Sequence, residues 1–260
     1  MTAISSQRPM VLVAEVHSDP ASKLVTADLV HRLSIQTICL EAGPHEPLVE
    51  VQQDVDQQLS AATRLLSRIS STAERMGCSF SANDLELMSP ACRRLLPLVF
   101  NTLGLSGDPE IAVRTALVMR LPGLTAKREM IRTLQQRNIE VVGIGSPVGV
   151  GIPVDTVTAV QPEAMARENG IMVANLLAQR RMGKSPLTLV SVLHMGPMIR
   201  GLVRGGLQPD RDFIAIWPSK HPHRDSFPGF VAETPQESPA STPEERAALV
   251  DSVAQRVLRS

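Results

Sequence analysis

The stretch PMVLVAEVHSDP, from Pro9 to Pro20, decides the fold that this sequence predicts. It begins with an unbroken apolar run, Met10 to Val13, and places Glu15 and His17 at the end of that run. Because side chains alternate faces along a strand, Glu15 and His17 lie on the same face as the odd-numbered residues before them. The run therefore predicts a buried strand with polar side chains at its carboxyl end.

A helix is predicted directly after this strand. Asp19 supplies a side-chain cap, and Pro20 follows where no backbone donor is missed. In open α/β sheets, ligands bind where a strand ends and the next helix begins. A carboxylate inside an apolar strand is costly unless it has a partner, so Glu15 demands either a function or a partner.

The rest of the chain repeats the alternation of strands and helices. Apolar runs rich in β-branched residues predict further strands at Ile35–Glu41, Ile139–Gly145, Leu187–Leu193 and Phe213–Trp217. Apolar residues at helical spacing predict helices at Ser22–Leu33, Leu48–Met76, Thr125–Arg137 and Pro162–Met182, with another beginning at Gly196 and Pro197. This order predicts an α/β protein with a mainly parallel sheet and flanking helices.

The same pattern predicts the domain organisation. Residues 1–220 form the α/β domain, with a helical insertion at about 46–122 between the second and third strands. We expect breaks in the insertion at Pro90, Pro97 and Gly107, and its end at Pro122 and Gly123. Residues 221–260 are rich in Pro and Ser, which predicts an irregular tail with a terminal helix from Glu244 to Leu258.

Composition excludes several functional classes. The chain has 260 residues, and its 26 basic side chains equal its 26 acidic ones, so its net charge favours neither nucleic acid nor an anionic membrane. Aromatic residues make up only 2%, which argues against base stacking, and no apolar run is long enough for a membrane span. The first residues lack the pattern of a secretory signal, and Cys39, Cys78 and Cys92 are widely spaced. A cytoplasmic protein and one exported without a cleaved signal both fit these features.

Side chains that can ligate a metal or move a proton recur at the predicted strand ends. They are Glu15, His17, Glu41 and His194, the last expected to follow its strand directly. Parallel neighbouring strands would bring them to one edge, where they could act as an acid–base pair. Alternatively, His17, Glu41 and His194 could ligate a divalent metal ion. The competing interpretations are a solvated Glu41 and structural histidines at 17 and 194.

Other candidates carry weaker signals. Arg167 lies near the start of a predicted helix, where the helix dipole disfavours a cation. Either a partner anion holds the arginine there or the side chain is simply solvated at the surface. Cys39 precedes Glu41 within an apolar strand and fits a small core residue better than a nucleophile. Ser18 and Ser146 do not lie in a GxSxG elbow, and the glycine-rich loop at 146–152 lacks a GxxxxGK sequence.

Four segments in order resemble one enzyme superfamily. AEVHSDP at residues 14–20, LEAG around Glu41, RENGIMVAN from Arg167 and VSVLHMGPMIRGL around His194 resemble the superfamily of erythromycin esterase, ChaN, TraB and the TIKI proteases. That superfamily also includes a domain of the Pasteurella multocida toxin. Two positions depart from its pattern: Ala14 stands where the first motif has Gly, and Ser191 or Val192 stands where a Gly precedes the late His.

The resemblance implies an α/β sheet with its site at the strand ends, and a hydrolase that cleaves an ester or peptide bond, with or without a metal. In this interpretation His17 or His194 activates water, Glu15 and Glu41 orient or ligate, and Arg167 stabilises negative charge. Some members are type III effectors of bacterial pathogens, delivered into host cells. The alternative is a non-catalytic protein that binds a host protein or a haem-type ligand.

Overall fold

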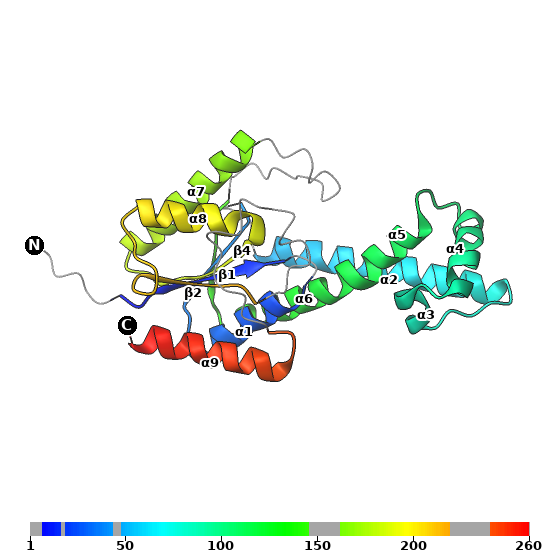
Figure 1. Cartoon of the computed structure of the whole chain (residues 1–260), viewed down its shortest axis with the longest axis horizontal. Coiled ribbons are helices and arrows are strands. Elements are labelled where there is room, and N and C mark those ends of the chain that lie inside the picture. Colours follow the sequence, from blue (N-terminus) through cyan, green and yellow to red (C-terminus); the bar gives the residue numbers. More distant parts are fainter. Residues whose placement is uncertain (1–6, 17–18, 44–47, 146–161, 219–239, 260) are drawn as a thin grey trace, which may run out of the picture. The chain divides into compact units, whose positions relative to one another are not determined.

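The computed structural model describes residues 7–16, 19–43, 48–145, 162–218 and 240–259 (Figure 1). Its strands form a five-stranded sheet in the order β3-β2-β4-β1-β5, and every pair of neighbours is parallel. The strands are β1 (Met10–Glu15), β2 (Thr37–Leu40), β3 (Glu140–Gly143), β4 (Leu187–Ser191) and β5 (Phe213–Ile216). This confirms the predicted α/β class with a parallel sheet.

Helices cover both faces of the sheet (Figure 1). On one face, α1 (Ala21–Leu33), α9 (Pro243–Arg259) and the end of α6 (Leu121–Gln136) pack against side chains such as Val13 and Leu189. On the other face, α7 (Pro162–Arg181) and α8 (Val192–Arg204) pack against side chains such as Leu12 and Val190. The inner strands β1, β2 and β4 are buried on both faces, which explains why they appear in the sequence as largely apolar runs.

The start of α8 corrects one prediction. The sequence predicts a strand that continues to Leu193, with the next helix beginning at Gly196, but β4 ends at Ser191 and α8 begins at Val192. The side chain of Ser191 caps this helix by accepting from the backbone N–H of Leu193. No loop separates β4 from α8, so the helix begins five residues before Pro197, which lies inside it.

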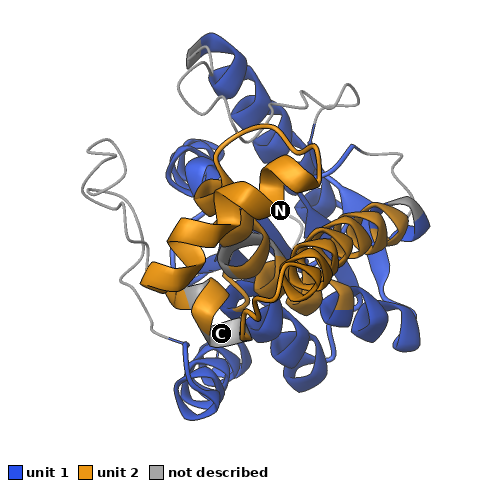
Figure 2. Ribbon diagram, turned by 90° about the vertical axis from the view of Figure 1, so that its right-hand side faces the viewer, with its two compact units in different colours: residues 1–16, 21–51, 129–260 blue, residues 17–20, 52–128 orange. Residues whose placement is uncertain are grey.

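Contacts divide the chain into two compact units (Figure 2). Unit 1 comprises residues 1–16, 21–51 and 129–260, and it contains the sheet. Its terminal helix α9 packs on α1 and contributes Val250, Val253 and Val257 to the core. Residues 221–239 of the predicted tail lie outside the described residues.

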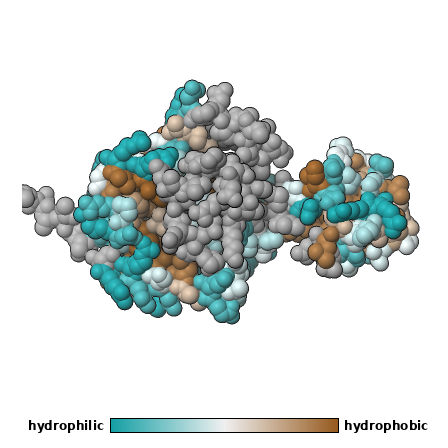
Figure 3. All heavy atoms as spheres, viewed as in Figure 1, coloured by the Kyte–Doolittle hydropathy of each residue, from teal (hydrophilic) through white to brown (hydrophobic). Residues whose placement is uncertain are grey.

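Unit 2 comprises residues 17–20 and 52–128, and it is helical where described. It has its own apolar core, which includes Ile69, Leu96, Phe100 and Val113. Some apolar side chains stay on its surface (Figure 3), among them Leu87 and Ile111. Its elements are most of α2 (Leu48–Arg75) and the first turns of α6, with α3 (Ala82–Leu87), α4 (Pro90–Thr102), α5 (Pro109–Arg114) and a π-helical turn η1 (Thr115–Arg120) between them.

Two predicted interruptions in this unit are wrong. Pro97 lies inside α4 on its exposed side, so the carbonyl of Arg93 that loses its backbone donor lies on a side open to water. Pro122 and Gly123 lie within α6 instead of ending the helical region. The π-helical turn rearranges the hydrogen bonds directly before Pro122.

No helix among the described residues is both long and apolar enough to cross a membrane.

Candidate active site at the carboxyl edge of the sheet

The carboxyl ends of β1 and β4 form a topological switch point. The two strands are neighbours, with Glu15 level with Ser191. The helix after β1, α1, packs on one face of the sheet, and the helix after β4, α8, packs on the other. In open α/β sheets a ligand-binding crevice opens where successive helices leave on opposite faces. The candidate residues Glu15 and His194 therefore lie at the part of the sheet edge where this topology predicts a ligand site.

Glu15 is buried at this edge and pairs with a buried lysine from α1. Lys23 Nζ lies 3.0 Å from Glu15 Oε1, and it also donates to the carbonyl of Val16 at 2.7 Å. The two side chains are only 1% and 6% exposed. Sequence reasoning missed Lys23. Its signal was its position on the helix, three and seven residues before the buried Thr26 and Val30.

His194 lies in the first turn of α8, where both of its ring nitrogens have partners. Nε2 lies 3.0 Å from Glu41 Oε1, and Nδ1 lies 2.8 Å from Asn169 Oδ1. The backbone N–H of Ser191 donates to the other oxygen of Glu41, Oε2, at 2.7 Å. The segment after β2, the start of α8 and the middle of α7 thus meet in one chain of hydrogen bonds, Asn169–His194–Glu41–Ser191.

The imidazole of His194 and the carboxylate of Glu41 lie within hydrogen-bonding distance, since Nε2 is 3.0 Å from Oε1. The contact of Nδ1 with Asn169 Oδ1 holds the ring in this orientation. An imidazole and a carboxylate placed in this way can exchange a proton, which is what general acid–base catalysis needs.

Asn169 is a second site residue that sequence reasoning did not single out. It is buried on α7, two residues after the candidate Arg167, which is exposed. Residues two apart on a helix do not face each other. Arg167 makes no hydrogen bond or ion pair with any residue that the structure describes, whereas the asparagine beside it in the RENG segment contacts His194.

The predicted metal set stays a prediction. His17 lies outside the described residues, and its position relative to Glu41 and His194 is not part of the geometry above. In the part of the chain that the structure describes, no three His, Cys, Asp or Glu side chains lie together as a metal site would need. Two described ligand atoms, His194 Nε2 and Glu41 Oε1, fall short of the three protein ligands of a catalytic zinc.

Cys39, one strand position before Leu40, is fully buried on the face covered by α7 and α8. Burial raises the pKa of its thiol to about 12. A thiol in this state is not a nucleophile at neutral pH. The structure thus agrees with the interpretation of Cys39 as a core residue.

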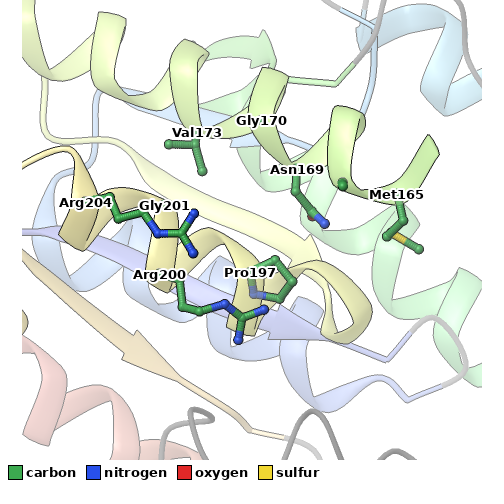
Figure 4. Close-up of a pocket in the computed structure, with 9 residues that line it drawn as sticks. Met165, Asn169, Gly170, Val173, Pro197, Arg200, Gly201 and Arg204 are labelled. Carbon is green, nitrogen blue, oxygen red and sulfur yellow. The ribbon is translucent and has the colours of Figure 1, made fainter. Parts of the chain in front are cut away.

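A cavity of about 460 Å³ lies between α7 and α8, with Asn169 in its lining (Figure 4). Arg200 and Arg204 from α8 line it together with small and apolar side chains, among them Met165 and Pro197. The cavity therefore adjoins the hydrogen-bonded chain through Asn169.

Comparisons with known proteins identify no relative. No protein-family model matches the chain, and searches of curated proteins and of solved structures also found no match.

Proposed function

We propose that this chain is a hydrolase that cleaves an ester bond in a small molecule by acid–base catalysis at Glu41. The observation that carries the proposal is the 3.0 Å contact between the buried His194 and the half-buried Glu41 at the carboxyl edge of a parallel sheet. A carboxylate that shares a proton with an imidazole can take a proton from water and later deliver it to a leaving group. The resemblance to the erythromycin esterase superfamily supports the same reaction class.

The geometry favours Glu41, rather than His194, as the group that meets the substrate. The side chain of Glu41 is 26% exposed, against 9% for His194. Both ring nitrogens of His194 are occupied, Nε2 by Glu41 and Nδ1 by Asn169. His194 and Asn169 are therefore positioning residues in this proposal.

The proposed reaction proceeds in two proton transfers. Glu41 accepts a proton from water as the water oxygen bonds to the ester carbonyl carbon. When the bond between that carbon and the alkoxy oxygen breaks, the same proton goes to the departing alkoxide. The products are a carboxylic acid and an alcohol, and Glu41 returns to its starting form. Roles for Glu15, His17 and Arg167 in this reaction stay predictions.

The experiment is a screen of small-molecule esters with wild type and Glu41→Gln. The amide keeps an acceptor for Ser191 but cannot take up a proton, so we expect turnover to fall by about 10²- to 10⁴-fold. Glu140→Gln is the matched control, since Glu140 lies at the amino end of β3, the opposite edge of the sheet. Equal turnover by wild type and Glu41→Gln, for an ester that the purified protein hydrolyses, would contradict the proposal.

Metal assistance is a separate proposal, which rests on the predicted ligands His17, Glu41 and His194. Elemental mass spectrometry of purified wild type, His17→Ala and His194→Ala tests it directly. A near-stoichiometric divalent metal that both variants lose would support a metal-assisted hydrolase. Absence of metal from all three folded proteins would leave the acid–base form of the proposal.

A non-catalytic binding protein is the second candidate, whether its partner is a small ligand or a host protein that a delivered effector engages. The cavity between α7 and α8 favours it, because both nitrogens of the adjacent His194 are already bonded. If the Glu41→Gln protein keeps full biological effect while remaining folded, binding explains the function better than hydrolysis.

A further inference from the structure

The cavity between α7 and α8 is lined by one face of each helix. From α7 the lining includes Ala166, Gly170 and Val173, which are spaced four and three residues apart. From α8 it includes Pro197, Arg200, Gly201 and Arg204, which also lie along one face (Figure 4). With about 460 Å³, the cavity has the size of a small-molecule site.

Small residues create this space. A Cβ atom added to Gly170 would meet no other atom within 4 Å, so the cavity is open beside it. Gly201 has a different role: a Cβ there would lie 2.6 Å from Val173 Cγ2, so this glycine lets the two helices approach closely. The helices are thus held tightly together at Gly201 while a hollow remains at Gly170.

The polar part of the lining is basic. Arg200 and Arg204 are one turn apart on α8, and no Asp or Glu is among the described residues that line the cavity. Guanidinium groups bind carboxylate and phosphate oxygens with two parallel hydrogen bonds. The remaining lining, apart from Asn169, is apolar or glycine.

We infer that this cavity binds an anionic small molecule with an apolar body, with its carboxylate or phosphate on Arg200 and Arg204. Because Asn169 both lines the cavity and bonds His194, the ligand lies next to the proposed catalytic pair. If the chain is the proposed hydrolase, this ligand class names its substrate as an ester that carries an anionic group and an apolar chain. Only this naming of the substrate rests on the proposed function. Binding itself is independent of hydrolysis.

The binding test uses three probes of equal chain length on the full chain: octanoate, 1-octanol and octylamine. Isothermal titration calorimetry should show tightest binding for octanoate. Arg200→Gln and Arg204→Gln should each weaken octanoate about tenfold or more, since each removes a hydrogen bond to a charged group. Arg181→Gln, an exposed arginine of the same helix pair outside the cavity, should leave affinity unchanged. Equal binding of the three probes, or no binding of octanoate, would overturn the inference.

A second variant fills the cavity without touching an arginine. Gly170→Leu places a side chain into open space, and replacing a helical glycine favours the helix. We expect unchanged or higher thermal stability and at least tenfold weaker octanoate binding, whereas Ala174→Leu, at an exposed α7 position outside the lining, should not affect binding. Undiminished octanoate affinity in folded Gly170→Leu would place the ligand elsewhere and refute the cavity as its site.

Hydrolysis distinguishes failure of this inference from failure of the proposed function. The substrates are the p-nitrophenyl esters of hexanoic acid and of adipic acid, the second of which keeps a free carboxylate. Faster hydrolysis of the adipate ester, with the preference lost in Arg200→Gln, supports both the binding site and the hydrolase function. Arginine-dependent octanoate binding with no hydrolysis of either ester supports the binding site and contradicts the hydrolase. Glu41-dependent hydrolysis with no preference for the anionic ester contradicts the substrate class alone.

Discussion

Two lysine–glutamate pairs in unit 1 have similar lengths and very different surroundings. Lys23 lies 3.0 Å from Glu15, with side chains that are 1% and 6% exposed. Lys184 lies 2.6 Å from Glu140, with side chains that are 31% and 49% exposed. The contrast predicts that Lys23→Met destabilises the protein far more than Lys184→Met does.

The magnitude follows from burial. Removing one partner of a buried ion pair costs about 3–5 kcal/mol, because the other group stays in the interior after losing its charged partner. Breaking an exposed pair costs about 0.2–1 kcal/mol. With a urea m-value of about 2 kcal/mol/M, a loss of about 3 kcal/mol lowers the unfolding midpoint of Lys23→Met by about 1.5 M. The Lys184→Met midpoint should move by less than about 0.5 M on the same scale.

Urea unfolding followed by tryptophan fluorescence measures this difference. Trp217 is the only tryptophan in the chain, and it is buried in the core of the unit that holds both pairs. The double variant Lys23→Met/Glu15→Leu is the control, since replacing a buried pair by apolar residues is often neutral. Similar midpoints for Lys23→Met and Lys184→Met, or a double variant no more stable than Lys23→Met, would refute the reasoning.

Three further predictions concern packing, titration and reactivity. Gly201→Ala should lower the free energy of unfolding by about 1–3 kcal/mol, because its Cβ would lie 2.6 Å from Val173, and adding Val173→Ala should restore most of the loss in urea unfolding. The hydrogen bond from Lys184, followed by that from Thr37, lowers the pKa of Glu140, so its contribution to stability exists above the ordinary glutamate range and disappears as the pH falls through the lowered pKa. Stability measured against pH should therefore decline less at acidic pH in Lys184→Met than in wild type. Iodoacetamide should leave Cys39 unmodified in the native protein and modify it after unfolding, as mass spectrometry of peptides would show, because burial raises the pKa of its thiol to about 12.

The parallel sheet was predictable because its signal is local. Strands β1, β2 and β4 are runs of four to six buried, mostly apolar residues, and the boundary of every strand lies within a few residues of its prediction. The error in the sheet occurred where a strand passes directly into a helix. Leu193 suits a strand by composition, but Ser191 caps a helix two residues earlier. Such a cap is decided by backbone geometry, which an apolar run does not reveal.

The candidate site was predictable only as a set of strand ends. Glu41 and His194 are brought together because β2 and β4 are neighbours, and the sequence does not specify strand order. Asn169 and Lys23 were missed since their roles depend on helix rotation: each lies on a helix face turned inward, among apolar residues that dominate the periodic pattern. For both Asn169 and Lys23, the sequence signal that could have been used is a polar residue at a helix position whose helical neighbours are apolar.

The partners of the two carboxylates separate their roles. Glu15 is paired with the side-chain nitrogen of Lys23, whereas Glu41 is paired with an imidazole, the side chain that most often serves in acid–base catalysis. We therefore expect the folded Lys23→Met/Glu15→Leu variant to retain ester hydrolysis, while Glu41→Gln loses it. Both variants remove a carboxylate from the same edge of the sheet, so loss of hydrolysis in both, with unfolding midpoints near wild type, would show that Glu15 takes part in the chemistry and that its pairing with Lys23 is no guide to its role.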